Sequence, residues 1–119
     1  MILIVGSAGS GKRSFVQSLG YTDTQIADAA CNAGPVVAHL EQLVFANPDC
    51  ADVLLPQLLQ KDAVLCREVG SGVMPVDEAE RLGREATGRL CILLAQQADC
   101  VIRMVCGIPT ILKGTLPRR

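Results

Sequence analysis

Hydrophobic residues in this chain gather in short continuous runs, separated by polar and glycine-rich segments. Aliphatic and β-branched runs predict buried strands at 2–5, 63–66 and 100–106, with a weaker strand at 25–30. Gly107 and Pro109 follow the last run, and they predict that the strand ends there.

Between these runs, apolar residues recur at intervals of three or four, which is typical of an amphipathic helix. Pro75, Asp77 and Glu78 favour the start of a long helix, because proline and carboxylates are common in a first helical turn. Its predicted apolar face comprises Val76, Ala79, Leu82, Ala86, Leu90, Leu93 and Leu94. Shorter helices are predicted at 12–19, 36–45 and 50–59.

Strands that alternate with helices predict an α/β fold, in which a parallel sheet is covered by helices on both faces. The length of 119 residues favours a single domain over residues 1–119. The chain has 11 basic and 12 acidic residues, and only 3% of it is aromatic. This composition argues against nucleic acid as a partner, because it offers neither a basic surface nor rings for base stacking.

The first residues lack the positive segment and cleavage site of a secretory signal, and no apolar run reaches the length of a membrane span. The six cysteines include no Cys-x-x-Cys pair, which argues against a zinc ribbon or a thioredoxin-like site. We therefore expect a cytoplasmic protein without a membrane partner, whose reduced cysteines serve as small core residues.

A glycine-rich segment follows the first predicted strand and opens the first predicted helix. It matches the pattern G-x-x-x-x-G-K through Gly6, Ser7, Ala8, Gly9, Ser10, Gly11 and Lys12. Glycines allow backbone N–H groups to surround a phosphate, and the lysine can reach the β- and γ-phosphates. The segment predicts nucleotide binding, with Lys12 also a candidate catalytic residue. The alternative is a turn that only packs the strand against the helix.

The residue after Lys12 departs from this motif. A Ser or Thr is expected there, because its hydroxyl binds Mg²⁺, whereas this chain has Arg13 followed by Ser14. Ser14 lies about 100° further round the helix and cannot simply substitute. Arg13 either contacts a phosphate itself or lies in solvent. We include both residues in the predicted nucleotide site, and the motif indicates phosphate binding more directly than metal-assisted transfer.

A second motif, Arg67-Glu68-Val69-Gly70-Ser71-Gly72-Val73-Met74-Pro75, follows the predicted strand at 63–66. Loops at the carboxyl ends of parallel strands line the ligand crevice, so this loop is expected to face the phosphate loop. Glu68 could orient a water molecule, a metal ion or a substrate hydroxyl. It could also cap a helix or lie in solvent.

The two motifs together resemble the adenosylcobinamide kinase / adenosylcobinamide-phosphate guanylyltransferase family of cobalamin biosynthesis. That family has Gly-Gly-x-x-Ser-Gly-Lys-Ser in its phosphate loop, then Asn-Glu-Val-Gly-x-Gly-x-x-Pro, then Arg-Asp-x-x-Gly-Arg. The matching residues here are Gly6, Ser10, Gly11, Lys12, Glu68, Val69, Gly70, Gly72, Pro75, Arg84, Glu85, Gly88 and Arg89. The resemblance covers residues 1–20 and 63–113.

The resemblance implies a P-loop NTPase (RecA-like) three-layer fold with a mainly parallel sheet, ATP or GTP as cofactor with Mg²⁺, and assembly into homo-trimers. It implies phosphoryl transfer to a corrinoid, followed by guanylyl transfer through a histidine. Glu68 would then be catalytic, and the residues that contact the substrate would be Gly70, Gly72, Arg84 and Arg89. Asp28 stands where a metal-binding acid is expected, although a turn or cap role is an equal alternative.

Three departures from the family pattern affect this interpretation. The segment that carries the guanylylated histidine is missing, and the one histidine present, His39, is interpreted as structural. Arg13 replaces the metal-binding hydroxyl, and Cys91-Ile92 replaces an Asn-Gln pair. The first hypothesis is therefore a nucleotide-dependent phosphoryl or guanylyl transferase of cobalamin biosynthesis, with guanylyl transfer in doubt. The alternative is a catalytically degenerate nucleotide-binding, regulatory or assembly protein of the same fold.

Overall fold

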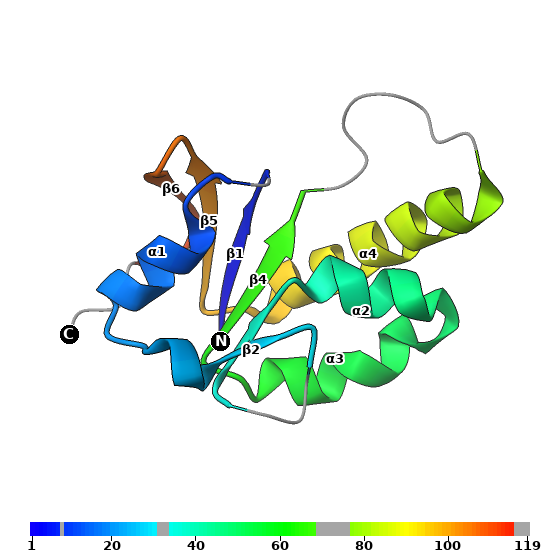
Figure 1. Ribbon diagram of the computed structural model, residues 1–119, viewed down its shortest axis with the longest axis horizontal. Coiled ribbons are helices and arrows are strands. Elements are labelled where there is room, and N and C mark those ends of the chain that lie inside the picture. Colours follow the sequence, from blue (N-terminus) through cyan, green and yellow to red (C-terminus); the bar gives the residue numbers. More distant parts are fainter. Residues whose placement is uncertain (8, 31–33, 69–76, 116–119) are drawn as a thin grey trace.

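The computed structural model describes residues 1–7, 9–30, 34–68 and 77–115, which form an α/β fold around one six-stranded sheet (Figure 1). The strand order is β2-β3-β4-β1-β5-β6. The strands are β1 (Ile2–Gly6), β2 (Ile26–Asp28), β3 (Val36–Ala38), β4 (Ala63–Arg67), β5 (Cys100–Val105) and β6 (Ile108–Lys113). All neighbouring strands are parallel except β5 and β6. The predicted mainly parallel sheet is confirmed.

Helices lie on both faces of this sheet. They are α1 (Lys12–Ser18), α2 (Leu40–Ala46), α3 (Ala51–Leu59) and α4 (Glu78–Gln97), with short 3-10 helices at Asp23–Gln25 and Pro48–Cys50. Successive residues of a strand point to opposite faces, so each face has its own core. Leu3 of β1 packs in the core that contains α2, α3 and α4, whereas Ile4 packs in the core that contains α1. Figure 1 shows α1 across the sheet from the other three helices.

The connections that follow the neighbouring strands β1 and β4 lead to opposite faces of the sheet, and they define where a ligand site can form. After β1 the chain enters α1 on one face, whereas the helix that follows β4 lies on the other face. Since β1 and β4 are neighbours, the segments of chain that leave their carboxyl ends diverge toward opposite faces of the sheet. In open α/β sheets this divergence forms the crevice in which ligands bind.

The predicted helix at 36–45 is wrong in its first part. Val36–Ala38 forms β3, whose three residues are all buried between β2 and β4, and the helix starts only at Leu40. A continuous apolar run is typical of a strand buried on both faces. Here the run is followed at helical spacing by Leu40, Leu43 and Val44. The apolar positions of β3 and α2 therefore fitted a single helical period, and the strand was not separated from the helix. The weaker strand predicted at 25–30 is confirmed as β2.

The prediction that the last strand ends at Gly107 and Pro109 is incomplete, because the chain turns there and forms a further strand, β6. Cys106 and Gly107 both have positive φ, 52° and 77°, and they connect β5 to the antiparallel strand β6. Positive φ at both positions is the geometry of the two-residue turn that matches strand twist. Pro109 is compatible with β6 because β6 is an edge strand.

The long helix is confirmed as α4, but its buried face differs from the prediction. Asp77 caps it by accepting a hydrogen bond from Glu80 N, and its buried residues are Gly83, Ala86, Thr87, Leu90 and Leu94. Ala79 and Leu82 are exposed, Leu93 is half-buried, and Val76 lies outside the described residues. No helix in the described ranges has both the length and the apolar character that crossing a membrane would require.

Two glycines inside α4 allow the packing of α2 on α4 to be tested. A Cβ at Gly88 would meet nothing within 4 Å, whereas a Cβ at Gly83 would lie 2.8 Å from the ring of Phe45 in α2. Replacing glycine by alanine inside a helix stabilises it by about 1 kcal/mol. We expect Gly88→Ala to gain this free energy of unfolding and Gly83→Ala to gain none, because Phe45 must move. Urea unfolding measures both, and equal gains would contradict this packing.

Candidate functional site

A pocket of about 330 Å³ lies at the carboxyl edge of the parallel strands. It is lined by the glycine-rich segment, the start of α1, the end of β3 and the middle of β4. The lining residues are Gly9, Ser10, Gly11, Lys12, Arg13, Ser14, Ala38, His39 and Leu65. Six of these residues belong to the predicted nucleotide site. The structure therefore brings most of that prediction together around one concave surface.

The loop backbone takes a conformation that its glycines permit. Gly9 and Gly11 have φ of 75° and 96°, a region that favours glycine. At Gly6 the constraint is space, since a Cβ would lie 2.7 Å from the carbonyl oxygen of Met104 in β5. Gly107 N donates a hydrogen bond to Ser10 O at 2.9 Å, which ties the loop to the β5–β6 turn. Ala8 lies outside the described residues.

Lys12 folds back over this loop. Its Nζ donates to the carbonyl oxygens of Gly6 at 3.1 Å and Ser7 at 2.8 Å, and lies 3.5 Å from Ser10 Oγ. Burial lowers the pKa of Lys12 below its ordinary value of 10.5, although the nearby charge of Glu41 acts in the opposite direction. The loop therefore holds an ammonium group whose hydrogen-bond partners carry no net charge.

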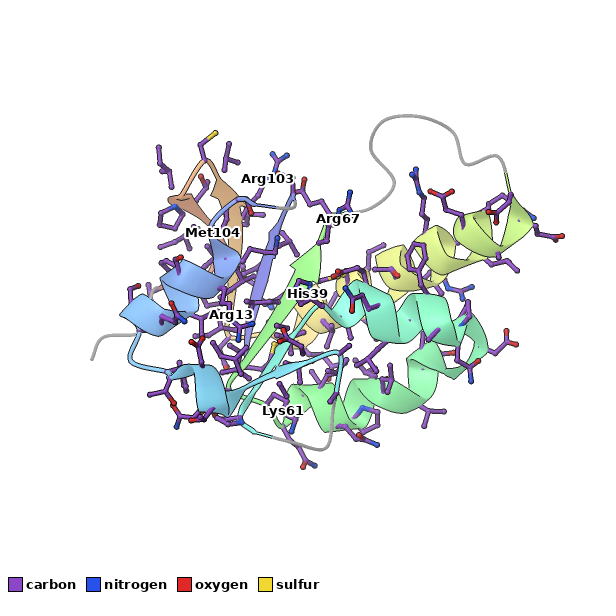
Figure 2. The ribbon with its side chains drawn as sticks, in the orientation of Figure 1. Arg13, His39, Lys61, Arg67, Arg103 and Met104 are labelled. Atoms are coloured by element: carbon purple, nitrogen blue, oxygen red, sulfur yellow. The ribbon has the colours of Figure 1, made fainter. Side chains whose placement is uncertain are left out.

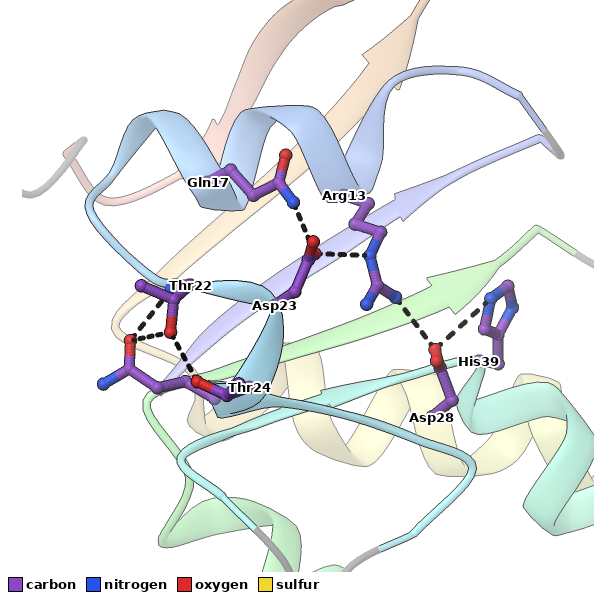
Figure 3. A network of polar contacts seen from close by, with 8 residues as sticks. Arg13, Gln17, Thr22, Asp23, Thr24, Asp28 and His39 are labelled. Carbon is purple, nitrogen blue, oxygen red and sulfur yellow. Dashed lines mark hydrogen bonds and ion pairs between the residues drawn. The ribbon is translucent and has the colours of Figure 1, made fainter.

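Arg13 points into a network of acids that follows α1 in the chain (Figure 3). Its Nε lies 3.2 Å from Asp23 Oδ1, and its Nη1 lies 3.0 Å from Asp28 Oδ1. Gln17 Nε2 donates to the same oxygen of Asp23 at 2.6 Å. Burial acts to lower the pKa of Arg13. The hydrogen bonds to these two acids and their negative charges outweigh burial, so the pKa lies above its ordinary value. Arg13 is thus a permanently charged wall of the pocket, held by two carboxylates.

His39, which the sequence analysis interpreted as structural, also lines the pocket. Its Nε2 lies 3.6 Å from Asp28 Oδ1, and its Nδ1 lies 3.5 Å from Glu41 Oε2. It follows β3 directly and has a φ of 57°, an uncommon conformation for a residue with a side chain. Ala29 and Cys106, which directly follow β2 and β5, also have positive φ. Such strained positions are concentrated at functional sites.

Asp28, the predicted metal-binding acid, reaches the site but faces Arg13. The resemblance implies that Mg²⁺ would be held by a hydroxyl at position 13 together with this acid. Position 13 instead carries a guanidinium, which repels a cation and is hydrogen-bonded to the acid. Among the described residues, no group of three or more His, Cys, Asp or Glu side chains is arranged to hold a metal ion. The residues present do not fit Mg²⁺ in the way the resemblance implies.

Glu68 lies beside the phosphate loop, as the sequence predicted. Its backbone N–H donates to Gly6 O at 2.9 Å. Its carboxylate is paired with Arg103 of β5, with Oε1 2.6 Å from Nε and Oε2 3.3 Å from Nη2. Sequence reasoning missed Arg103, whose signal was one charged residue near the carboxyl end of an apolar strand. Figure 2 shows Arg67 and Arg103 at the carboxyl ends of their strands, and Lys61 at the opposite edge.

A second missed residue, Glu41, lies in the first turn of α2. Its Oε1 accepts a hydrogen bond from Arg67 N at 2.9 Å, just after the buried part of β4. Its side chain is only 12% exposed, and its charge acts on Lys12. Glu41 therefore links α2 to the edge of the sheet beside the pocket.

The predicted substrate-binding residues are not brought to the pocket. Arg84 Nη2 donates to Glu80 Oε1 at 3.0 Å along α4, and Arg89 is exposed on the same helix. Neither lines the pocket. Gly70 and Gly72 lie outside the described residues.

The Cys91-Ile92 pair also lies away from the pocket. Cys91 Sγ is 3.6 Å from Cys66 Sγ in the core on the face of the sheet covered by α2, α3 and α4, and Ile92 is exposed. The hydrogen bond with Cys91 and burial raise the pKa of Cys66, so this thiol is neutral. Cys66, Cys91, Cys100 and Cys106 are free thiols, as expected, but Cys106 is exposed in the hairpin turn and is not a core residue.

Comparison with known proteins leaves the site to be interpreted from its own geometry. No protein-family model matches the chain, and a search of curated proteins finds no match.

The space at Gly6 gives a test of the loop. In Gly6→Ala, the new methyl group would collide with Ser10 Oγ and with Met104 O, and overpacking of this kind costs about 1–3 kcal/mol. We expect the free energy of unfolding to fall by that amount in chemical denaturation.

A second variant separates the two collisions. Ser10→Ala removes the hydroxyl but leaves Met104 O, which cannot retreat without weakening the β1–β5 pairing. The double variant Gly6→Ala/Ser10→Ala should therefore remain destabilised relative to Ser10→Ala. Wild-type stability in Gly6→Ala would contradict the close approach of β1 and β5.

Proposed function

We propose that the protein binds the phosphates of ATP or GTP at the loop of residues 6–12, within a P-loop NTPase (RecA-like) three-layer fold. The observation that carries this proposal is the position of Lys12, whose ammonium is held against the loop carbonyls and lines the pocket. The uncommon backbone of Gly9 and Gly11 supports it, because such loops turn N–H groups toward an anion. The interior position of β1 in the parallel part of the sheet supports the fold assignment.

We further propose that the bound nucleotide serves phosphoryl or guanylyl transfer to a corrinoid, as the resemblance to adenosylcobinamide kinase / adenosylcobinamide-phosphate guanylyltransferase implies. Lys12 would bind the transferred phosphate, and Glu68 would orient the acceptor group. The hydrogen bond from Glu68 N to Gly6 O supports this role, because it sets the acid next to the phosphate loop. Catalysis would come from positioning and charge stabilisation.

The alternative is a catalytically degenerate protein that binds nucleotide as a switch or stabiliser. Two observations favour it. Asp28 and Glu68, the acids that would serve a transferase, are both paired with arginines. Carboxylate oxygens that already accept hydrogen bonds from an arginine are less available to a substrate hydroxyl or a water molecule.

We also propose that the protein assembles into homo-oligomers, with a trimer as the resemblance implies. The support is a set of exposed apolar side chains on the β5–β6 hairpin, namely Val105, Ile108, Ile111 and Leu112. Apolar side chains exposed along an edge strand are a common site of contact with another chain.

Replacing Lys12 tests nucleotide binding. In Lys12→Ala we expect the affinity for ATP or GTP to fall at least tenfold, because a hydrogen bond to a charged group contributes about 1.5–3 kcal/mol. Calorimetric titration measures the affinity. Turnover assays with adenosylcobinamide, run on the wild type, distinguish the transferase from the degenerate protein.

Lys61→Ala is the matched control. Lys61 Nζ also donates to a backbone carbonyl, that of Gly34 at 2.9 Å, but it lies at the opposite edge of the sheet (Figure 2). This variant should bind nucleotide like the wild type. Unchanged affinity in Lys12→Ala would refute nucleotide binding at the loop, and binding without turnover would favour the degenerate protein.

The lowered pKa of Lys12 predicts how affinity depends on pH. A bound phosphate stabilises the ammonium, so the pKa of Lys12 is higher in the complex than in the free protein. Affinity is then constant while Lys12 is protonated in both states, and it falls as pH rises above the free-protein pKa. Because burial lowers the pKa of Lys12, we expect this fall to begin at a lower pH than for a lysine in water, and titrations across the alkaline range measure it.

Lys12→Arg provides the reference for this pH profile. A guanidinium stays protonated throughout the range, so its affinity should not show the same fall. Parallel pH profiles for the wild type and Lys12→Arg would contradict contact between Lys12 and phosphate.

A further inference from the structure

The guanidinium of Arg13 is fixed in place but retains donors for a ligand. Arginine has five N–H groups in one plane, and here Nε binds Asp23 while Nη1 binds Asp28. No acceptor among the described residues is bonded to Nη2. Because Asp23 and Asp28 hold two different nitrogens of the planar guanidinium, the direction of the remaining donors is also fixed. Arg13 lines the pocket next to Lys12, at the proposed phosphate site.

Acidic side chains lie at the edge of the pocket, so phosphate binding there requires a positive group beside Lys12 that offsets their charge. Asp28 and Glu41 both lie near His39 at the pocket edge, and unpaired carboxylates in this place would repel a phosphate. Arg13 neutralises Asp28 directly at 3.0 Å. Its planar donors also match phosphate oxygens, which they can bind in pairs. A divalent cation that approached Asp28 would be repelled by the guanidinium of Arg13, which lies 3.0 Å from Oδ1 of the same carboxylate.

We infer that Arg13 takes the place of the metal ion, so that the pocket binds the phosphates of a nucleotide without Mg²⁺. Lys12 supplies the uncompensated positive charge and Arg13 supplies further hydrogen-bond donors, whereas Asp23 and Asp28 are positioning residues that orient the guanidinium. This inference rests on the proposed nucleotide binding. It replaces the Mg²⁺ that the resemblance implies with a residue of the chain itself.

The first test needs no variant. The affinity of the wild-type protein for ATP and for GTP is measured by calorimetric titration, once with excess Mg²⁺ and once with EDTA. We expect the metal-free nucleotide to bind as tightly as the Mg²⁺ complex or more tightly, because the complex carries less negative charge to meet Arg13 and Lys12. Nucleotide that binds at least tenfold more tightly with Mg²⁺ would overturn the inference and leave the proposed function intact. Binding in neither buffer would overturn both.

Variants of Arg13 then assign the effect to this residue. Arg13→Gln should weaken metal-free binding roughly ten- to hundredfold, the range expected for a lost hydrogen bond to a charged group. Arg13→Ser should lose metal-free affinity to the same extent, but it should recover part of it on addition of Mg²⁺. The recovery is expected because the new hydroxyl and the released Asp28 offer the two ligands that a metal ion needs.

Arg81→Ser is the matched control. Arg81 is also held by two carboxylates, with Glu78 at 3.4 Å and Glu85 at 3.6 Å, but it lies on α4 and does not line the pocket. Its replacement should change nucleotide affinity in neither buffer. Wild-type affinity of Arg13→Gln for nucleotide in EDTA would overturn the role of Arg13, even if wild-type binding is independent of metal.

Discussion

The close approach of three backbone segments at the carboxyl end of β1 is the constraint on which the whole site depends. Gly6 pairs with Arg67 of β4 on one side and with Met104 of β5 on the other. Its carbonyl oxygen accepts hydrogen bonds from Glu68 N and Lys12 Nζ. A side chain at position 6 would collide with β5, so only glycine keeps β1 paired to its last residue. The phosphate loop therefore starts from a point fixed on both sides.

From this fixed point, the charged groups around the loop divide into two kinds. The acids Asp28 and Glu68 each have an arginine partner, Arg13 and Arg103, at hydrogen-bond distance. Lys12 instead donates to carbonyl oxygens, which carry no net charge. The charges of Asp28 and Glu68 thus each meet a positive charge within the protein, whereas no carboxylate is hydrogen-bonded to Lys12 among the described residues. This difference is the basis of the proposal that the loop binds a phosphate rather than a cation.

The parts of the fold that could be predicted are those that local sequence encodes. The apolar runs of β1, β4 and β5 and the glycine spacing of the loop are each contained within a few residues. β3 was missed because its three residues continue into the helical spacing of α2, and β6 was missed because Pro109 was interpreted as a strand end. In both cases position in the sheet, which is not local, decided the outcome.

In the candidate site, too, the residues set by a local motif were predicted and the contacts between distant residues were not. The loop residues that line the pocket were predicted, because the motif itself sets their spacing. The ion pair between Glu68 and Arg103 joins residues 35 positions apart, and the contact of Arg13 with Asp28 spans 15. Such pairs arise from strand order and from the path of the chain around α1. No periodicity or motif in a single sequence encodes them.

That path also explains how a guanidinium can stand where a hydroxyl is usual. After α1 the chain turns through the 3-10 helix at Asp23–Gln25 and enters β2, which ends at Asp28. The connection that returns the chain to the sheet therefore carries both acids past the same side of α1. Arg13, in the first turn of that helix, is hydrogen-bonded to Asp23, the first residue of the 3-10 helix, and to Asp28, the last residue of β2. A metal ion must bind from solution, whereas the guanidinium of Arg13 is put in place when the chain folds. The departure at position 13 is thus matched by two acids whose placement the connection after α1 determines.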